Sequence, residues 1–423
     1  MTEKLIKELK QSLTSYHAVE TAEKELISRG FKKLAETSAW KIEPNGKYYV
    51  VRDGSALVAF RAGAEKSFGI VASHTDSPCF KIKPGGENRS ADCTRLEVER
   101  YGGGLMYSWL DVPLKIAGRA IYLEGGKVVS HTVALEETFV IPSVAIHFNR
   151  TANDGLKFNP QVDMQVLAAI GDKTKRVEAE LENAHPGKLM DYDLFVTAAG
   201  APFVCGFDDE LICTPRADNL TSVFASVEAI AECEQKCTAV IFLADNEEVG
   251  SRTRQGAGST FLKDVLERVA AAYGWTDEDY KIALSDSFMV SCDNAHAAHP
   301  NHPELSSPNN KVSLGGGVVI KHHANQNYTT DAMSSAIVKC VFEKAGVSYQ
   351  DFFMRSDLPC GGTLGAISSS QLSVRSVDIG IPQLAMHSYA ETFAPSDYAA
   401  LVKGLKAFLS CSLSSEENSV TIK

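Results

Sequence analysis

Five segments of the sequence carry side chains that could bind a metal ion, and four of them contain an apolar run typical of a buried strand. In α/β sheets, functional groups collect at the carboxyl ends of the strands, where segments that are distant in sequence can meet. Imidazole and carboxylate groups are common ligands of divalent ions such as zinc. The pattern therefore predicts a metal site built from His74, Asp218, Glu247, Glu248, Asp293 and His387.

Glu247 and Glu248 are adjacent and closely follow the apolar run AVIFLA. Successive side chains on an extended backbone point in different directions. One glutamate can therefore bind a metal while its neighbour acts as a base toward a bound water. Two adjacent acids without a cation would repel each other and resist burial, which favours a metal nearby.

The charges of these side chains fit a site with two zinc ions. The carboxylates of Asp218, Glu248 and Asp293, together with a bridging hydroxide, would balance the four positive charges. His74 and His387 would bind as neutral imidazoles, and Asp218 is the natural bridge. Paired metals can lower the pKa of a bound water from about 15.7 to near 7, so hydrolysis is the predicted chemistry. Such ligands also accept Co²⁺ or Mn²⁺.

His74 and Asp76 form an HTD triplet. In an extended chain, the Asp76 carboxylate could accept the second ring N–H of His74 and so orient the imidazole toward the metal. We therefore predict that Asp76 acts through His74. The sequence has no GxSxG motif, which weakens a covalent mechanism with a serine nucleophile.

A second group of histidines, His296, His299 and His302, has a three-residue spacing that one helix face could present. Pro300 and Pro303 break any helix there. We therefore expect these histidines to contact the substrate or orient other groups, and not to bind metal.

The composition excludes several classes of protein. Across 423 residues the net charge is −11, which argues against binding to nucleic acid or to an anionic membrane. The N-terminal segment lacks the apolar core of a signal peptide, and no run approaches the length of a membrane span. The ten cysteines are scattered without a CxxC pair, as expected for reduced thiols in the cytoplasm.

The order of patterns along the chain predicts two domains, one inserted into the other. Residues 1–85 and 204–423 show helices alternating with strands, whereas residues 86–203 are β-rich with glycine turns and almost no helical periodicity. The predicted fold is α/β, with a mixed, largely parallel sheet flanked by helices and an inserted β-rich domain. The segment PGGENRSADC should break the strand pattern at the boundary.

Several elements follow from periodicity and turn residues. Asp53-Gly54 should form the turn of a hairpin. A strand is expected over residues 281–290 and another near 347–354. The expected helices span residues 19–29, 220–235, 259–273, 330–345 and 395–413.

Many of these segments resemble the M18 aminopeptidase (aspartyl aminopeptidase) family. The similar motifs run in the family's order from residue 73 to residue 388, and several extend over five or more residues. They are SHTDSP, YGGGLMYSWLD, PRADNL, DNEEVGS, DNAHAAHPN, KHHANQNY, DLPCGGTLG and PQLAMHS. The resemblance implies a fold of the di-zinc exopeptidase type and removal of single N-terminal residues from peptides, with a preference for Asp or Glu.

The resemblance also implies roles for the metal-site residues. One zinc would be held by His74, Asp218 and Asp293. The second would be held by Asp218, Glu248 and His387. Glu247 would be the general base, and Asp76 the partner of His74.

Further roles follow from the same resemblance. Lys321 and Tyr328 match positions near the substrate side-chain pocket, and His296 matches a position near the scissile carbonyl. In the family, the β-rich domain pairs subunits, and the dimers assemble into a tetrahedral dodecamer. The segment IPSVAIHF resembles one from which a neighbouring subunit contributes a histidine, which makes His147 a candidate.

Two alternatives stay open from the sequence. A carboxypeptidase or N-deacylase of the same two-metal fold needs a group that binds the substrate carboxylate. No isolated arginine at a predicted strand end suits that task, although Arg216 and Arg355 stay open. The chain could instead be a self-assembling scaffold without catalysis. The presence of Glu247 together with every predicted ligand argues against the scaffold, because the loss of any one of these residues would inactivate the site.

Overall fold

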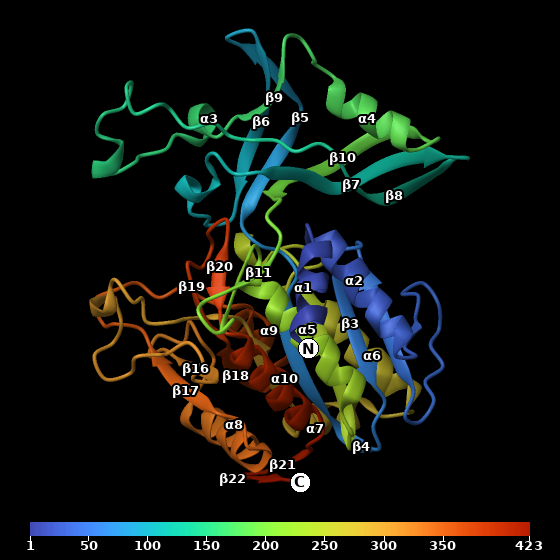
Figure 1. The fold of residues 1–423 in the computed structure, drawn as a ribbon. Helices are drawn as coiled ribbons and strands as arrows, with labels where there is room; N and C mark the ends of the chain where they lie inside the picture. Colours follow the sequence, from blue (N-terminus) through green and yellow to red (C-terminus); the bar gives the residue numbers. More distant parts are fainter.

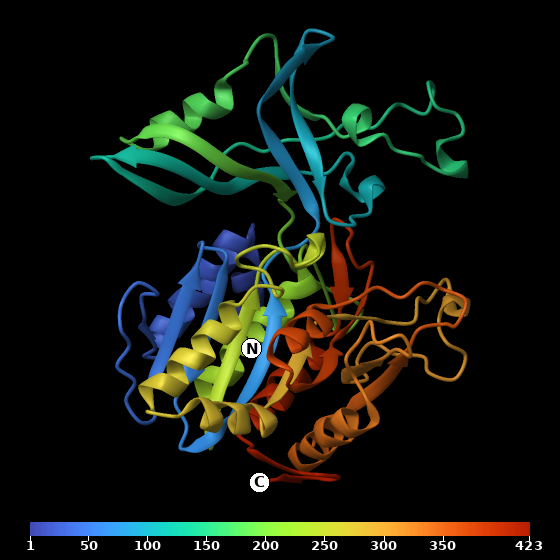
Figure 2. The same cartoon turned by 180° about the vertical axis from the view of Figure 1, so that it is seen from behind.

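The computed structural model describes residues 1–423, and its ribbon divides into two bodies joined by a narrow connection (Figures 1 and 2). The lower body in Figure 1 contains a nine-stranded sheet with helices on both faces, and the upper body contains a six-stranded sheet. The chain enters the upper body through β5 (Cys79–Ser90) and leaves it through β10 (Lys188–Ala198). The β-rich block is therefore an insertion into the α/β body.

The nine-stranded sheet is mixed. Its four central strands, β13, β4, β14 and β18, run parallel to one another, while β3 and β16 run antiparallel to their central neighbours. The predicted α/β class with a mixed, largely parallel sheet is confirmed. In spatial order the strands are β1 (Lys32–Lys33), β2 (Lys47–Arg52), β3 (Ala56–Arg61), β13 (Cys237–Ala244), β4 (Glu65–His74), β14 (Phe288–Cys292), β18 (Arg375–Gly380), β16 (Val318–His322) and β17 (Tyr349–Phe353).

Helices cover both faces of this sheet, so its central strands are apolar on both sides. Val71 of β4 packs into the core of one face, and the adjacent Ile70 packs into the core of the other. The helices on the Val71 face are α1 (Thr2–Gln11), α2 (Ser15–Ser28), α5 (Ala217–Glu232), α8 (Ala332–Ala345) and α10 (Pro395–Leu409). Those on the Ile70 face are α6 (Phe261–Ala272), α7 (Asp277–Ser285) and α9 (Leu364–Leu372).

The six-stranded sheet of the upper body is antiparallel and has its own core, which includes Leu96, Ile116 and Val196. Two helices, α3 (Pro160–Asp163) and α4 (Arg176–Ala184), belong to this body. The insertion limits 86 and 203 stay a prediction, although the first strand of the sheet already begins at Cys79. In spatial order the strands are β8 (Lys127–Ala134), β7 (Leu114–Glu124), β10 (Lys188–Ala198), β5 (Cys79–Ser90), β6 (Cys93–Tyr101) and β9 (Val166–Ile170).

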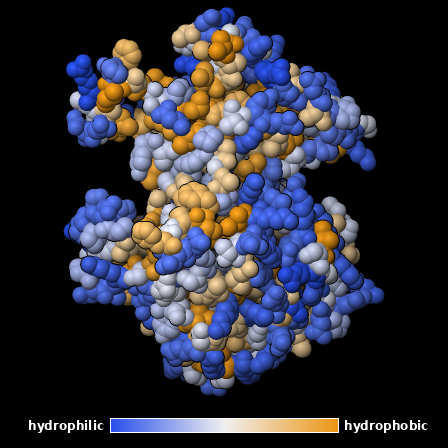
Figure 3. All heavy atoms as spheres, in the orientation of Figure 1, coloured by the Kyte–Doolittle hydropathy of each residue, from blue (hydrophilic) through white to orange (hydrophobic).

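A five-stranded sheet lies near the junction of the two bodies (Figure 1), and the space-filling view shows a waist at this level with hydrophobic atoms on its surface (Figure 3). Its strands are β11 (Phe203–Cys205), β12 (Leu211–Thr214), β20 (Glu391–Phe393), β19 (Pro382–Leu384) and β15 (Ala295–His296). The C-terminal hairpin consists of β21 (Leu413–Glu416) and β22 (Ser419–Ile422). Short 3₁₀ turns are η1 (Met106–Trp109), η2 (Ala152–Asp154), η3 (Glu247–Val249) and η4 (Pro303–Leu305).

Most expected elements of the α/β body are present, but the strand predicted over residues 281–290 was wrong at its start. Helix α7 ends at Ser285, and β14 begins only at Phe288. The side chain of Thr276 accepts the N–H of Asp279, and the Asp279 side chain accepts the N–H of Thr276. This capping box stabilises a helix where the apolar pattern alone favoured a strand.

Two predictions about the β-rich body were also wrong. The segment PGGENRSADC does not break the pattern, because β5 continues to Ser90 and pairs with β6 across a hairpin. The turn residues Ala91 and Asp92 both have positive φ, as a two-residue hairpin turn requires. Helix α4 is the second error, since helical periodicity was judged nearly absent from this block.

The hairpin turn at Asp53-Gly54 is confirmed by the pairing of β2 with β3. The ten cysteines form no disulfide. No helix combines the length and the apolar character that crossing a membrane demands.

Candidate metal and catalytic centre

Three neighbouring parallel strands bring part of the predicted site to one edge of the nine-stranded sheet. Ala244, the last residue of β13, lies beside His74, the last residue of β4. The strand on the other side, β14, ends one residue before Asp293. Because the carboxyl ends of parallel strands meet at the same edge, His74, Asp293 and the Glu247–Glu248 turn lie together.

The other two predicted ligands lie in segments that follow strands of the five-stranded sheet. Asp218 lies in the first turn of α5, shortly after β12, and His387 follows β19. Glu391 of β20, which lies between these strands, accepts the backbone N–H of Asp218 at 2.9 Å and that of His387 at 2.7 Å. Glu391 is buried, and burial raises its pKa to about 8. Glu391 was not among the predicted site residues, although an acid four residues after His387 was a signal.

The side chains of the predicted ligands lie close enough to one another to bind shared metal ions. His74 Nε2 lies 3.5 Å from Asp218 Oδ1 and 3.9 Å from Asp293 Oδ1. His387 Nε2 lies 3.4 Å from Asp218 Oδ2 and 3.4 Å from Glu248 Oε1. Ligand atoms around a tetrahedral zinc with bonds of about 2.0–2.2 Å are roughly 3.3–3.5 Å apart. The two oxygens of Asp218 therefore face two separate groups of donors.

Two carboxylate oxygens in this cluster have no hydrogen-bond partner although they are buried. They are Asp218 Oδ1 and Glu248 Oε1. Leaving a buried acceptor unpaired costs about 1–3 kcal/mol, and more for a charged group. The ligand atoms of His74, Asp218 and Glu248 all lie within 4.8 Å of one another. Unpaired oxygens facing imidazole nitrogens fit a divalent cation.

The pKa values of the site show how strongly the charges interact. Burial by itself would raise the pKa of Asp218, but the nearby imidazoles of His387 and His74 hold this pKa below its ordinary value. Burial opposes the charged form of His387, yet Asp218 and Glu248 raise the pKa of His387 to about 10. Burial raises the pKa of Glu247 to about 8, and the charges of Asp293 and Asp76 add to this rise against the opposing effect of His74.

Asp76 does more than the sequence predicted. His74 Nδ1 hydrogen-bonds the backbone carbonyl of Asp76 at 3.1 Å, and the Asp76 carboxylate lies 3.4 Å from the same nitrogen. The carboxylate also accepts the backbone N–H groups of Glu247 and Glu248, at 3.1 and 3.2 Å. Tyr101 O–H donates to it at 2.7 Å. Asp76 therefore orients both the histidine and the paired glutamates.

The backbone is strained around the site. Arg216, Asn246 and His387 all have φ between 60° and 66°, a region that non-glycine residues rarely occupy. The Asn246 side chain is held by hydrogen bonds to Tyr101, Thr253 and Gln255. Such strain persists where surrounding contacts enforce it, and it is common at functional sites.

The glycines of the YGGGLMY segment allow close packing against the site. Gly102 has a φ of +76°, and a Cβ on it would lie 3.1 Å from the Cβ of Glu248. Leu105 N–H donates to the backbone carbonyl of His387 at 2.9 Å. This segment leads from the β-rich body and buttresses two predicted ligands.

A cavity of about 200 Å³ opens beside the predicted ligands. Lys321, Tyr328 and His296 line it together with Glu247, as the predicted substrate roles require. His299 and His302 are exposed and do not line it. His147 is exposed on the β-rich body and does not reach the cavity of its own chain.

Lys321 is a charged side chain held almost completely out of water, with 2% exposure. Its ammonium donates to the backbone carbonyl of Asn294 at 3.2 Å and lies 4.0 Å from Asp293 Oδ1. It also lies 5.0 Å from the centre of the Tyr328 ring. A buried ammonium with one carboxylate partner, itself a predicted ligand, can accept a further anion.

Neither candidate arginine lines this cavity. Arg216 donates to Thr197 Oγ1 and to the carbonyl of Ala198, and it lines a second cavity of about 480 Å³ whose lining also includes Asp218 and His387. Arg355 is paired with Asp357. The cavity beside Lys321 therefore contains no arginine for the substrate carboxylate that the carboxypeptidase alternative needs.

The chain is similar to known proteins over most of its length. The sequence model described as "Aminopeptidase I zinc metalloprotease (M18)" matches residues 9–409. The "Probable M18 family aminopeptidase 2" of Clostridium novyi is 40% identical over 416 residues, covering 94% of this chain and 96% of the relative.

Solved structures share the whole architecture. A chain in the cryo-EM structure of the Ape4 and Nbr1 complex has a TM-score of 0.92 at 32% identity, covering 96% of this chain and 85% of that one. A chain of the mApe1 dodecamer of S. cerevisiae has a TM-score of 0.82 at 28% identity, covering 96% of this chain and 95% of that one. The chain therefore belongs to the M18 aminopeptidase family and is a zinc metalloprotease that hydrolyses peptides.

Proposed function

We propose that the chain is a di-zinc aminopeptidase that removes acidic residues from the N-termini of peptides. The observation that carries the two-metal part is the position of Asp218, with one oxygen 3.5 Å from His74 Nε2 and the other 3.4 Å from His387 Nε2. His74, Asp218 and Asp293 would hold one zinc. Asp218, Glu248 and His387 would hold the other. Co²⁺ or Mn²⁺ could replace zinc at such ligands.

When bound, the zinc ions would polarise the scissile carbonyl and lower the pKa of the attacking water. Glu247 is the proton carrier in this proposal. It takes a proton from the water and delivers it to the leaving amine. Glu247 lines the cavity beside the predicted ligands, where a group that accepts and then releases a proton is needed.

Asp76 and Glu391 are positioning residues in this mechanism. Asp76 holds the backbone of Glu247 and Glu248 together and orients His74. Glu391 holds the backbone of Asp218 and His387. These contacts fix the predicted ligands of both metals before substrate arrives, which is what efficient catalysis needs.

The acidic preference rests on Lys321. Asp293 is the only carboxylate within 4.0 Å of the Lys321 ammonium. A zinc ion bound to Asp293 would compete with Lys321 for the negative charge of this carboxylate. A substrate Asp or Glu side chain would then supply the anion that a buried ammonium requires. Tyr328 would pack beside this side chain, and His296, exposed at the cavity rim, would contact the scissile carbonyl.

A panel of peptides that differ only in an N-terminal Asp, Glu, Leu or Lys tests the preference. We expect the highest kcat/KM for Asp or Glu, and we expect Lys321→Met to reduce that advantage without raising the low rate for N-terminal Lys. Val318→Ala, in the same strand but outside the cavity, is a matched control. If Leu is cleaved faster than Asp and Glu, the acidic pocket is wrong.

The proposed assembly is a tetrahedral dodecamer in which β-rich bodies pair. The similar S. cerevisiae mApe1 is described as a dodecamer. Exposed apolar side chains on the β-rich body, including Phe148 at 88% and Ile170 at 86% exposure, support burial against another subunit. His147, beside Phe148, would then reach a neighbour's active site. Light scattering that returns the mass of a single chain would contradict the assembly.

A further inference from the structure

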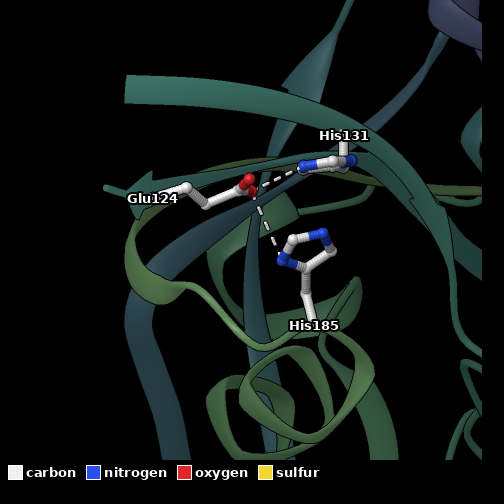
Figure 4. A group of neighbouring side chains, drawn as sticks. All are labelled: Glu124, His131 and His185. Carbon is white, nitrogen blue, oxygen red and sulfur yellow. Dashed lines mark hydrogen bonds and ion pairs between the residues drawn. The ribbon is translucent and has the colours of Figure 1, made fainter. Parts of the chain in front are cut away.

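A second cluster of potential metal ligands lies in the β-rich body, outside the site described above. Glu124 Oε1 lies 2.8 Å from His131 Nε2 and 3.4 Å from His185 Nδ1 (Figure 4). The two imidazole rings are 4.0 Å apart between centroids. All three ligand atoms lie within 4.8 Å of one another.

Three elements bring these residues together. Glu124 ends β7, His131 lies in the adjacent β8, and His185 follows α4. Ala120 pairs with His131 across the hairpin, and residues two and four positions further along β7 share the face of Ala120. The cluster therefore joins a hairpin tip to the segment between α4 and β10.

Tyr122 supports both histidines from the core. Its ring lies 4.7 Å from the ring of His185 and 5.7 Å from that of His131. Tyr122 is fully buried, and its hydroxyl donates to the backbone carbonyl of Leu181 in α4. A buried aromatic ring in contact with both imidazoles restricts their orientations.

Gly187 makes room for Glu124. A Cβ at position 187 would lie 2.8 Å from Glu124 Cγ and 2.9 Å from Tyr122 Cβ, closer than such atoms can approach. Only glycine allows the carboxylate side chain to lie where it does.

Two groups approach Nδ1 of His185. Gly187 N–H lies 3.3 Å from this nitrogen, and Glu124 Oε1 lies 3.4 Å from it. An imidazole nitrogen has one lone pair, so a zinc bound there would replace the contact with Gly187.

We propose that Glu124, His131 and His185 bind a divalent transition metal, with zinc the best match to two imidazoles and one carboxylate. The separation of 3.4 Å between Glu124 Oε1 and His185 Nδ1 already fits tetrahedral zinc, and the 2.8 Å contact to His131 has to lengthen by roughly half an ångström. A water fills the fourth position, since the cluster is open to solvent. The ion ties the β7–β8 hairpin to the start of β10.

Zinc content and anomalous diffraction test this site in the full-length protein. We expect the double variant His131→Ala/His185→Ala to bind one zinc fewer per subunit than the unaltered protein at the same buffered zinc concentration. Crystals soaked in zinc chloride should show an anomalous peak within about 2.0–2.2 Å of all three ligand atoms. This difference does not depend on how many metals the catalytic site holds.

Two milder variants separate metal loss from misfolding. Glu124→Gln keeps the size of the side chain and should lose the same zinc while peptidase activity is retained. Glu182→Gln, on the exposed face of α4 and in no ion pair, should keep the zinc and serves as the charge-matched control. Equal zinc content in Glu124→Gln and Glu182→Gln, with no anomalous peak at the cluster, would overturn the proposal.

Discussion

The two clusters of potential metal ligands in this chain are built in opposite ways. The cluster at the proposed catalytic site draws on five segments spread from His74 to His387, and the His74 and Asp218 side chains are only 1% and 4% exposed. The cluster in the β-rich body comes from one hairpin and the segment before β10, and its Glu124 and His131 side chains are 33% and 36% exposed.

This difference has energetic consequences. In the buried cluster, unpaired carboxylate oxygens cannot be satisfied by water, so a cation is part of what makes the arrangement tolerable. In the half-exposed cluster, water can replace the cation at little cost. We therefore expect the buried cluster to bind metal tightly and to need it for catalysis. We expect the half-exposed cluster to bind metal more weakly, with an effect only on local stability.

The largest expected effect comes from removing the shared carboxylate. Asp218→Asn should abolish zinc binding at the catalytic site and lower kcat/KM by on the order of 10⁴ or more, because the residue serves both ligand groups. Glu124→Gln should leave kcat/KM within about twofold, since that residue lies in the other body. Zinc analysis and a peptidase assay measure both. Full metal occupancy in Asp218→Asn would remove the bridging role.

A separate prediction distinguishes the proton carrier from the ligands. Glu247→Gln should keep its zinc and lower kcat by about 10²–10⁴, the usual contribution of a general base. The neighbouring Glu248→Gln is the matched comparison, because it should lose metal as well as activity. A Glu247→Gln enzyme with nearly normal kcat would contradict the assignment.

Asp76→Asn tests positioning without removing a ligand. Asparagine can accept fewer hydrogen bonds than the carboxylate, which receives two backbone N–H groups and the Tyr101 hydroxyl. We expect a loss of about 10–100-fold in zinc affinity or activity, as for other groups that orient metal ligands. Tyr101→Phe removes only one of these bonds and should have the smaller effect. An unchanged zinc affinity and kcat in Asp76→Asn would leave the residue without a positioning role.

The pH dependence of zinc binding gives a finer comparison. In the metal-free protein the pKa of His387 is raised to about 10, so His387 holds a proton at pH 7 that zinc must displace. Raising the pH removes this competition, and the apparent zinc affinity should rise by about tenfold per pH unit for each proton released, until pH approaches 10.

Calorimetry at pH 7 in buffers of different ionisation enthalpy measures the released protons directly. The heat of zinc binding to the catalytic site should vary with the buffer. Glu124→Gln, which lacks only the proposed second site, should retain this dependence. A heat of binding that is the same in every buffer would show that no proton is displaced.

The errors in the sequence analysis have local causes. Residues 281–290 were expected to form a strand because their apolar content was read without the Thr276–Asp279 capping box, which starts a helix there. Helix α4 was missed because its apolar face is short, with Val177 and Leu181 its only buried residues. Gly85 and Gly86 were taken as a break, yet the strand continues through them with a bulge between Ile82 and Glu87.

The α/β class and the M18 family were accessible from the sequence, and so were the side chains that the structure brings together at the strand ends. Strand ends that carry His, Asp and Glu are a local pattern, and the motifs around them are long enough to be specific. These features depend on residue type and spacing along the chain, which the sequence contains explicitly.

Other features depend on contacts between distant segments. Glu391 holding Asp218 and His387, Asp76 holding the two glutamates, and Glu124 meeting His131 and His185 arise only when separate strands pack together. The position of these residues along the chain does not predict that their side chains lie close together in space. Burial, which makes those contacts energetically important, is likewise set by packing of the whole chain.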